Sequence, residues 1–490
     1  MLPRGGGGPG SMARWWRTLG AAFALLALLG LAPALAQTGG AGRALALSDI
    51  HFDPLADPAL ADALAAAAVE DWGALFEHAA PAAPPLGAPL GAFGHDTPWP
   101  LWQSALARMQ AVLPRPDMIL FTGDFLVHGL GARFATAASD HSPQALRRFA
   151  LKTVRFLALD LARRFPAVPI LPVLGNNDSD CGDYALEPGG AFLAGLLPTL
   201  REMLAGDAAL APDLAPAWDA DGNYDIPHPT LAHARIIGLD SVVLSARYHD
   251  RCGGGDDRAP ARRTLEWLAT RLDAASAAGE RVWLLMHIPP GIDAYATLQA
   301  GLCTADPVDM WQPEALERFL ALVRAHAPTL AAVLAGHTHM ETFRLVGSGE
   351  DAVALLGLPG LSPIFGQNPA FQVITYDAEG VRDTETQFLA NLAGADAATA
   401  AWRAGAPFTA AYALPRPDTA ALRRLLPRLA GDGATRLEWL RRFATFRLAY
   451  WPLPEREGLA GPASLAAYRC ATATVTDAAF RACACPGAAP

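Results

Sequence analysis

The chain has 490 residues, 52% of them hydrophobic, and its formal net charge is -10 at pH 7. That length allows two to four domains, and the acidic balance excludes proteins that coat nucleic acids through a basic surface. Lys152 is the single lysine and every other strong cation is an arginine, a bias that we attribute to coding composition.

The N-terminal segment, residues 1–36, has the pattern of a secretory signal peptide. Residues 12–17 are basic, residues 19–31 form an apolar core too short to span a bilayer comfortably, and small residues for cleavage end at Ala36. Residues 1–11 precede this pattern and are rich in glycine, so the true start of the protein is open. An uncleaved membrane anchor is the alternative, and no later run is apolar enough to span a bilayer. We expect a secreted or periplasmic protein.

The chain then alternates between apolar runs and helical periodicity. The first of these runs predict strands at 43–47, 119–124, 168–174, 224–226, 234–239, 281–286 and 330–335. Helical periodicity predicts helices at 99–112, 143–165, 258–278 and 313–325. The Ala- and Pro-rich residues 54–98 are interpreted as an excursion across the rim of a site. A strand, a helix and a second strand in this order predict a parallel sheet.

The pattern changes after residue 340. Four strand-like segments follow without obvious helices between them, at 342–346, 353–358, 371–376 and 381–387. This change predicts a second, more antiparallel sheet packed on the first. Beyond about residue 390 the chain is rich in Ala, Leu and Arg, includes aromatic residues such as Trp451, and is expected to form a helical C-terminal region.

Five of the predicted strand ends carry side chains that bind divalent cations. These side chains are Asp49, His51, Asp124, Asn176, His287, His337 and His339. The carboxyl ends of strands are where open α/β sheets place their chemistry, so we expect the seven to converge.

Asp124 is the best candidate for a carboxylate that bridges two metal ions. Asp49, His51 and His339 would then complete the coordination of one ion. A second set of three would complete that of the other: Asn176, His287 and His337. Imidazole with carboxylate suits zinc first, with manganese or iron as alternatives, better than calcium. Two such ions about 3.5–4 Å apart would acidify a bridging water and clamp the oxygens of a phosphoryl group.

The motifs resemble those of the calcineurin-like metallophosphoesterase superfamily, namely Asp-x-His, Gly-Asp, Gly-Asn, a lone His and Gly-His-x-His. They occur in the family's order between about residues 43 and 390. His128 and the segments 286–291 and 362–371 are similar to the acid-sphingomyelinase-like phosphodiesterases and to the related endopolyphosphatases. The resemblance implies the same seven ligands with Asp124 bridging, and His128 as the proton donor to the leaving oxygen.

One position departs from the family motif, which has His where this chain has Asn177. An asparagine can still donate a hydrogen bond to a phosphoryl oxygen, but it cannot carry a proton. The sequence Asn-Asn-Asp is similar to that of endopolyphosphatase-like members. The departure weakens sphingomyelin as the expected substrate and places more weight on His128.

Six cysteines in an exported chain predict disulfides. Cys483 and Cys485 are too close to bond to each other, so one of them is expected to pair with Cys470, and the partner of Cys181 is open. The resemblance further implies a bond between Cys252 and Cys303, which flank His287.

Two residues near the Gly-Asn motif have two possible roles each. Asp178 is either a loop cap or a group that orients a ligand. Tyr184 lines either a substrate pocket or the core.

We expect an α/β fold, a four-layer α/β/β/α sandwich of two mixed sheets flanked by helices. Residues 37–390 would form the metallophosphoesterase catalytic domain and residues 391–490 a C-terminal helical subdomain. The reaction would be hydrolysis of small phosphoesters by a metal-bridging hydroxide, with His128 as general acid and Asn177 as a stabilising donor. We expect a small phosphoester or phosphoanhydride as the substrate, lipid-derived phosphodiesters included. A polyphosphate or nucleotide phosphatase is the first alternative, and a non-catalytic metal-binding or receptor protein is the second.

Overall fold

The computed structural model describes residues 41–79, 89–204, 214–447 and 461–487, together with residues 1, 5 and 6. Ala41–Pro490 forms one compact unit, separate from Met1–Gly40, and contains every element described below. The expected signal peptide and Trp451 lie outside the described residues.

The first sheet has six strands in the order β12-β11-β10-β1-β2-β3. Their bounds are β1 (Gly42–Leu47), β2 (Met118–Phe121), β3 (Ile170–Pro172), β10 (Ala370–Asp377), β11 (Gly380–Leu389) and β12 (Trp402–Ala404). β1, β2 and β3 run parallel, while β10, β11 and β12 pair antiparallel. All residues of β2 and β3 are buried, as expected for parallel strands covered on both faces.

The second sheet also has six strands, in the order β4-β5-β6-β7-β9-β8. Their bounds are β4 (Tyr224–Pro227), β5 (Ala234–Gly238), β6 (Arg281–Leu285), β7 (Leu330–Ala335), β8 (Thr342–Val346) and β9 (Val353–Gly357). The four inner strands β5, β6, β7 and β9 are parallel, and antiparallel β4 and β8 close the two edges.

The two mixed sheets confirm the predicted fold class, but the assignment of the late strands was wrong. β8 and β9 complete the second sheet, whereas β10 and β11 join β1 in the first. The free edge of β1 provides hydrogen-bond partners for β10, which pairs from Gly42↔Tyr376 to Ala46↔Gln372. A strand's pattern shows that it needs a neighbour but not which sheet edge supplies one.

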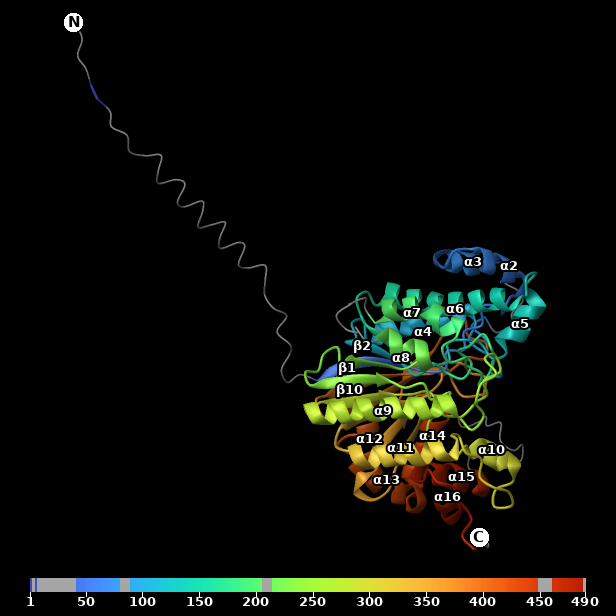
Figure 1. Cartoon of the computed structure of the whole chain (residues 1–490), viewed down its shortest axis with the longest axis vertical. Coiled ribbons are helices and arrows are strands. Elements are labelled where there is room, and N and C mark those ends of the chain that lie inside the picture. Colours follow the sequence, from blue (N-terminus) through green and yellow to red (C-terminus); the bar gives the residue numbers. More distant parts are fainter. Residues whose placement is uncertain (2–4, 7–40, 80–88, 205–213, 448–460, 488–490) are drawn as a thin grey trace. The chain divides into compact units, whose positions relative to one another are not determined.

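Helices cover both outer sides of the two sheets. α4 (Trp99–Val112), α6 (Pro143–Arg164) and α7 (Ala191–Met203) lie on one side, and α9 (Ala259–Ala278) and α11 (Pro313–His326) lie on the other (Figure 1). α6 begins where Ser142 accepts a hydrogen bond from the backbone N–H of Ala145, and it has a proline in its first turn. The predicted helices at 99–112, 143–165, 258–278 and 313–325 are all present.

Shorter helices fill the connections and the C-terminal region. The remaining bounds are η1 (Pro58–Leu60), α2 (Ala61–Ala66), η2 (Val69–Asp71), α3 (Trp72–His78), α5 (Leu130–Ala137), α8 (Leu214–Asp221), α10 (Ala294–Ala300), η5 (Gly349–Asp351), α12 (Phe408–Tyr412), α13 (Thr419–Gly431), α14 (Gly433–Phe443), α15 (Pro462–Ala473) and α16 (Asp477–Ala484). Arg442 of α14 makes a buried ion pair with Glu341 at 2.7 Å, which ties α14 to the segment between β7 and β8. The expected domain boundary near residue 390 stays a prediction.

Three disulfides connect the six cysteines. Cys470 bonds to Cys483, which confirms the pairing expected for Cys470. The bond expected between Cys252 and Cys303 was wrong, because Cys252 pairs with Cys181 and Cys303 with Cys485. The Cα atoms of these two bonded pairs lie 5.8 and 5.5 Å apart, which is ordinary disulfide spacing.

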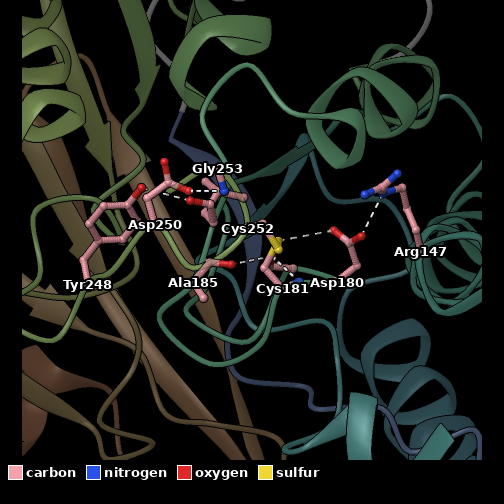
Figure 2. The surroundings of a disulfide bond; sticks show 10 residues. Arg147, Asp180, Cys181, Ala185, Tyr248, Asp250, Cys252 and Gly253 are labelled. Carbon is pink, nitrogen blue, oxygen red and sulfur yellow. Dashed lines mark hydrogen bonds and ion pairs between the residues drawn. A yellow bond between two sulfur atoms is a disulfide. The ribbon is translucent and has the colours of Figure 1, made fainter. Parts of the chain in front are cut away.

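The Cys181–Cys252 bond joins the loop after β3 to the loop before α9. Figure 2 shows this bond between Asp180 on one side and Asp250 and Gly253 on the other. Asp180 also forms an ion pair with Arg147 of α6 at 2.7 Å. The loop that carries Asn176 is therefore held from two directions.

The three disulfides indicate that the folded chain resides in an oxidising extracellular or lumenal compartment. Among the described residues there is no helix with the length and apolar character needed to cross a bilayer.

Candidate active site

The seven predicted metal ligands all follow parallel strands. Asp49 and His51 follow β1, Asp124 follows β2, and Asn176 follows β3 in the first sheet. The remaining three follow β6 and β7 of the second sheet, and they are His287, His337 and His339. The contacts described next show that the carboxyl ends of the two sheets meet, so that these side chains converge.

Asp124 lies at the centre of this group. Its Oδ2 atom is 3.2 Å from Nε2 of His51 and also 3.2 Å from Nε2 of His287. On the His51 side, Nε2 of His51 is 3.1 Å from Nε2 of His339, and Nε2 of His339 is 3.5 Å from Oδ1 of Asp49. One carboxylate oxygen is thus shared between two sets of potential ligands.

The second set surrounds the side-chain oxygen of Asn176. This Oδ1 atom is 2.9 Å from Nε2 of His287 and 2.8 Å from Nδ1 of His337. The Asn176 amide nitrogen donates to Asp183 at 2.7 Å, which orients the oxygen toward the centre. The other ring nitrogen of His337, Nε2, lies 3.2 Å from the hydroxyl of Tyr184.

Five of the seven residues have left-handed backbone conformations. Their φ angles are 49° for Asp49, 43° for His51, 63° for Asp124, 70° for His337 and 59° for His339. Each such angle costs about 1–3 kcal/mol for a residue with a Cβ atom, and such strain concentrates at functional sites. The turned backbone lets Asp49 and His51, two positions apart, face the same centre.

Two glycines allow the strand ends to approach each other. A Cβ atom on Gly175 would lie 2.1 Å from Oδ1 of Asp124, and one on Gly336 would lie 2.0 Å from Oγ of Ser48. Neither position has room for a side chain, so the glycines of both motifs are needed for packing of the site.

The hydrogen bonds of His51 and His287 show which ring nitrogen of each residue carries a proton. Nδ1 of His51 is 2.9 Å from the carbonyl oxygen of Leu126, and Nδ1 of His287 is 2.6 Å from that of Thr122. A carbonyl only accepts, so both Nδ1 atoms carry a proton, and in the neutral imidazole the lone pair is on Nε2. In that neutral form the two lone pairs would face the Oδ2 atom of Asp124, and a cation between them would remove the repulsion.

The electrostatics favour positive charge at the same place. Burial alone would raise the pKa of Asp124, but the imidazoles of His287 and His51 hold it well below its usual range. Burial disfavours charged imidazole, yet Asp124 raises the pKa of His51 to about 10 and that of His287 to about 9. Burial and then His287 lower the pKa of His337 to about 3, so that imidazole is neutral.

The ligand chemistry therefore fits divalent cations. Ligand atoms of Asp49, His51 and Asp124 all lie within 4.8 Å of one another, and all three side chains are buried. Carboxylate, imidazole and amide oxygen together are a donor set for zinc, manganese or iron.

Asp178 orients the loop that carries Asp124. Its carboxylate accepts hydrogen bonds from the backbone N–H groups of Asp124, Phe125, Leu126 and Gly175, at 2.8 to 3.1 Å. Burial, followed by the charge of Asp124, raises the pKa of Asp178 to about 7. Three of these donors lie 52 to 54 positions away in the sequence, so Asp178 orients the Asp124 loop as well as closing its own.

His128 lies beside the first set of ligands and is 31% exposed at its side chain. Its ring stacks on that of His51 with 3.8 Å between centroids. Nδ1 of His128 is 3.0 Å from Oδ1 of Asp96, and the hydroxyl of Ser362 donates to the same oxygen at 2.8 Å. Asp96 is buried, and despite that burial its bond to His128 holds its pKa well below the usual range.

Asp96 and Asp183 were missed by the sequence analysis. Asp96 lies near the end of the Ala- and Pro-rich segment 54–98, where it contacts His128, but no motif surrounds it. Asp183 follows Asn176 by seven residues, and only a search for carboxylates near the Gly-Asn motif could have found it.

Asn177 is directed at Asp124 in this structure. Its backbone N–H donates to Oδ1 of Asp124 at 2.8 Å, and its side-chain nitrogen lies 3.3 Å from Oδ2. The amide carries two hydrogens, so one remains for another acceptor.

The comparisons with known proteins agree on one family. A family model described as calcineurin-like phosphoesterase matches residues 42–341. Acid sphingomyelinase-like phosphodiesterase 3b of Homo sapiens is 27% identical over 423 residues, covering 82% of this chain and 83% of that protein. Sphingomyelinase phosphodiesterase D of Dictyostelium discoideum is 23% identical over 317 residues, covering 61% and 62%. Endopolyphosphatase of Schizosaccharomyces pombe is 28% identical over 192 residues, covering 36% and 29%. With more than half of its length matched by the family model, this chain belongs to the calcineurin-like phosphoesterase family and is a metal-dependent phosphoester hydrolase.

Proposed function

We propose that the protein is an exported phosphodiesterase that binds two divalent cations, with zinc as the first choice and manganese or iron as alternatives. Asp49, His51 and His339 would hold one ion, and Asn176, His287 and His337 the other. Asp124 would bridge them. The observation that carries this proposal is the position of its Oδ2 atom, 3.2 Å from an imidazole nitrogen of each set.

The two ions, when bound, supply an activated water nucleophile and positive charge against the phosphoryl oxygens. His128 supplies the proton. Asp96 holds Nδ1 of His128, so Nε2 is available to donate to the leaving oxygen as its bond to phosphorus breaks. The water oxygen forms the new bond to phosphorus, and the products are a phosphomonoester and an alcohol. The second amide hydrogen of Asn177 would donate to a phosphoryl oxygen.

A diester is favoured over a phosphoanhydride by the surroundings of the centre. A cavity beside His337 is lined mainly by aromatic and apolar side chains. The arginines that line it are Arg247 and Arg344, and Arg344 is buried and donates to the carbonyl oxygens of Pro290 and Ile292. A chain of phosphates would meet few cations there. The similarity to an endopolyphosphatase keeps a polyphosphate or nucleotide phosphatase as the second candidate.

A substrate panel separates the two candidates. Protein purified from its own compartment would be assayed on bis(p-nitrophenyl) phosphate, sphingomyelin, ATP and polyphosphate, with zinc, manganese or iron supplied. We expect the highest kcat/KM on a diester. A higher kcat/KM on ATP or polyphosphate would favour the second candidate, and no turnover on any of them with any metal would refute both.

Asp96 is expected to act as a positioning residue for His128. Asp96→Asn removes the charge that faces Nδ1 but keeps the size of the side chain, so we expect kcat to fall at least about tenfold. The fall should be larger for alkyl than for p-nitrophenyl leaving groups, because alkoxides need the proton more. A fall that is equal for both leaving groups would indicate a structural role for Asp96 instead.

For localisation, we propose export through a signal peptide that ends near Ala36, with the mature protein secreted or periplasmic. The three disulfides support passage through an oxidising compartment. N-terminal sequencing of the purified protein tests the cleavage, for which we expect Gln37 as the first residue.

A further inference from the structure

A cavity of about 240 Å³ opens beside the reaction centre. His337 and Tyr184 line one side of it, and Tyr468, Ala471 and Thr472 of α15 line another. The catalytic strands and the C-terminal helices thus contribute to the same cavity, although about 130 residues separate His337 from Tyr468 in the sequence.

Two aromatic residues that line the cavity contact the proposed ligands. The Tyr184 hydroxyl is 3.2 Å from Nε2 of His337, and the guanidinium of Arg247 lies 4.5 Å from the centroid of the Tyr184 ring. Phe365 also lines the cavity, and its ring packs edge-on against His339 with 4.7 Å between centroids. A group that enters the cavity would therefore touch residues adjoining both ligand sets.

The α15 wall is held by its own small core and by two disulfides. α10, α15 and α16 enclose a hydrophobic cluster that is separate from the main one, with members Ile292, Ala294, Leu298, Ala467, Cys470, Ala471, Phe480 and Ala484. Cys303–Cys485 fixes α16 to the loop after α10, and Cys470–Cys483 fixes α15 to α16. Figure 1 shows these three helices side by side. The Tyr468 ring packs on Phe443 of α14 with 4.9 Å between centroids.

The volume and the lining residues limit the size and the kind of group that this cavity can bind. Pockets for drug-sized ligands span about 300–1,000 Å³, so 240 Å³ accommodates a group of about one ring and not a long chain. The proton donor His128 stacks on His51, whereas the cavity adjoins His337 of the other ligand set. His337 itself lines the cavity, whereas His128 and His51 do not, so the cavity suits the group that stays on phosphorus.

We propose that Tyr468 and the disulfide-fixed α15 wall determine substrate specificity by binding a compact aromatic or apolar group that the phosphodiester retains. This inference rests on the proposed function. Aromatic walls bind such a group through stacking and apolar contact.

The test compares two diesters that share one leaving group. Bis(p-nitrophenyl) phosphate retains a ring, and methyl p-nitrophenyl phosphate retains a methyl group. For Tyr468→Ala we expect KM to rise about tenfold for the first and to stay within about twofold for the second. Tyr468→Phe should keep both values near wild type. Leu465→Ala, on the same helix but not lining the cavity, is the matched control.

A second variant and a binding measurement complete the test. Ala471→Leu narrows the cavity from the same wall and should discriminate against the ring-bearing diester if Tyr468→Ala fails to fold. Calorimetry should show weaker binding of phenylphosphonate, but not of methylphosphonate, to Tyr468→Ala. Equal changes for both diesters, or for neither, would overturn the inference. If wild type hydrolyses neither diester, the proposed function fails, and the phosphonate binding alone decides on the α15 wall.

Discussion

Asp124→Asn is expected to reduce phosphodiester hydrolysis at least about a thousandfold, which corresponds to about 4 kcal/mol of lost transition-state stabilisation. The substitution removes one negative charge at the point shared by His51 and His287. It also replaces one carboxylate oxygen with an NH2 group, which cannot bind a cation. The bridge between the two ligand sets would be lost while the side chain keeps its shape.

Activity and metal content should be measured on the same preparations of Asp124→Asn. Elemental analysis should show fewer than two ions per chain, and circular dichroism should show a folded protein, because Asp178 still holds the backbone of residues 124–126. Asp160→Asn is the matched control, since Asp160 is a buried carboxylate bonded to Trp102 and Gln103. Wild-type turnover by Asp124→Asn with two bound ions would contradict a bridging role.

His128→Ala is expected to lower kcat by about 10² to 10⁴ for diesters with an alkyl leaving group. The alkoxide that leaves is a strong base, so its departure without a proton is costly. For p-nitrophenolate, which is stable without a proton, the loss should be much smaller. The imidazole is placed for this role by its stacking on His51 and by its bond to Asp96.

The measurement is kcat for a series of aryl and alkyl diesters with leaving groups of increasing basicity. In wild type the rate should depend weakly on basicity, and in His128→Ala steeply. His141→Ala is the control, because His141 is an exposed histidine outside the site. Two parallel plots of rate against basicity would show that His128 does not donate the proton, and would leave it a structural or ligand role, since it lies within reach of His51 and His339.

Local sequence predicted most of the fold and the convergence of the proposed ligands. Each predicted ligand follows a short apolar run, and such runs end at a common edge when strands are parallel, so the convergence of Asp49, Asp124 and His287 could be expected. Gly175 and Gly336 stand directly before proposed ligands, and a Cβ atom at either position would clash with the site.

Long-range partners were harder to predict, because they depend on packing. Asp96 meets His128 from a segment without periodicity, and no spacing rule connects residues 32 positions apart. The pairing of Cys252 with Cys181 depends on how two loops fold against each other, and six cysteines allow 15 pairings. The division of β8 to β11 between two sheets also depends on which edges the earlier strands leave free.

The central claim is that two cations share Asp124. A crystal structure of the metal-loaded protein, with anomalous scattering recorded at the absorption edge of the metal found by elemental analysis, tests it most directly. We predict two anomalous peaks about 3.5–4 Å apart, both within bonding distance of the Asp124 carboxylate. A single peak, or two peaks of which only one contacts Asp124, would contradict the account.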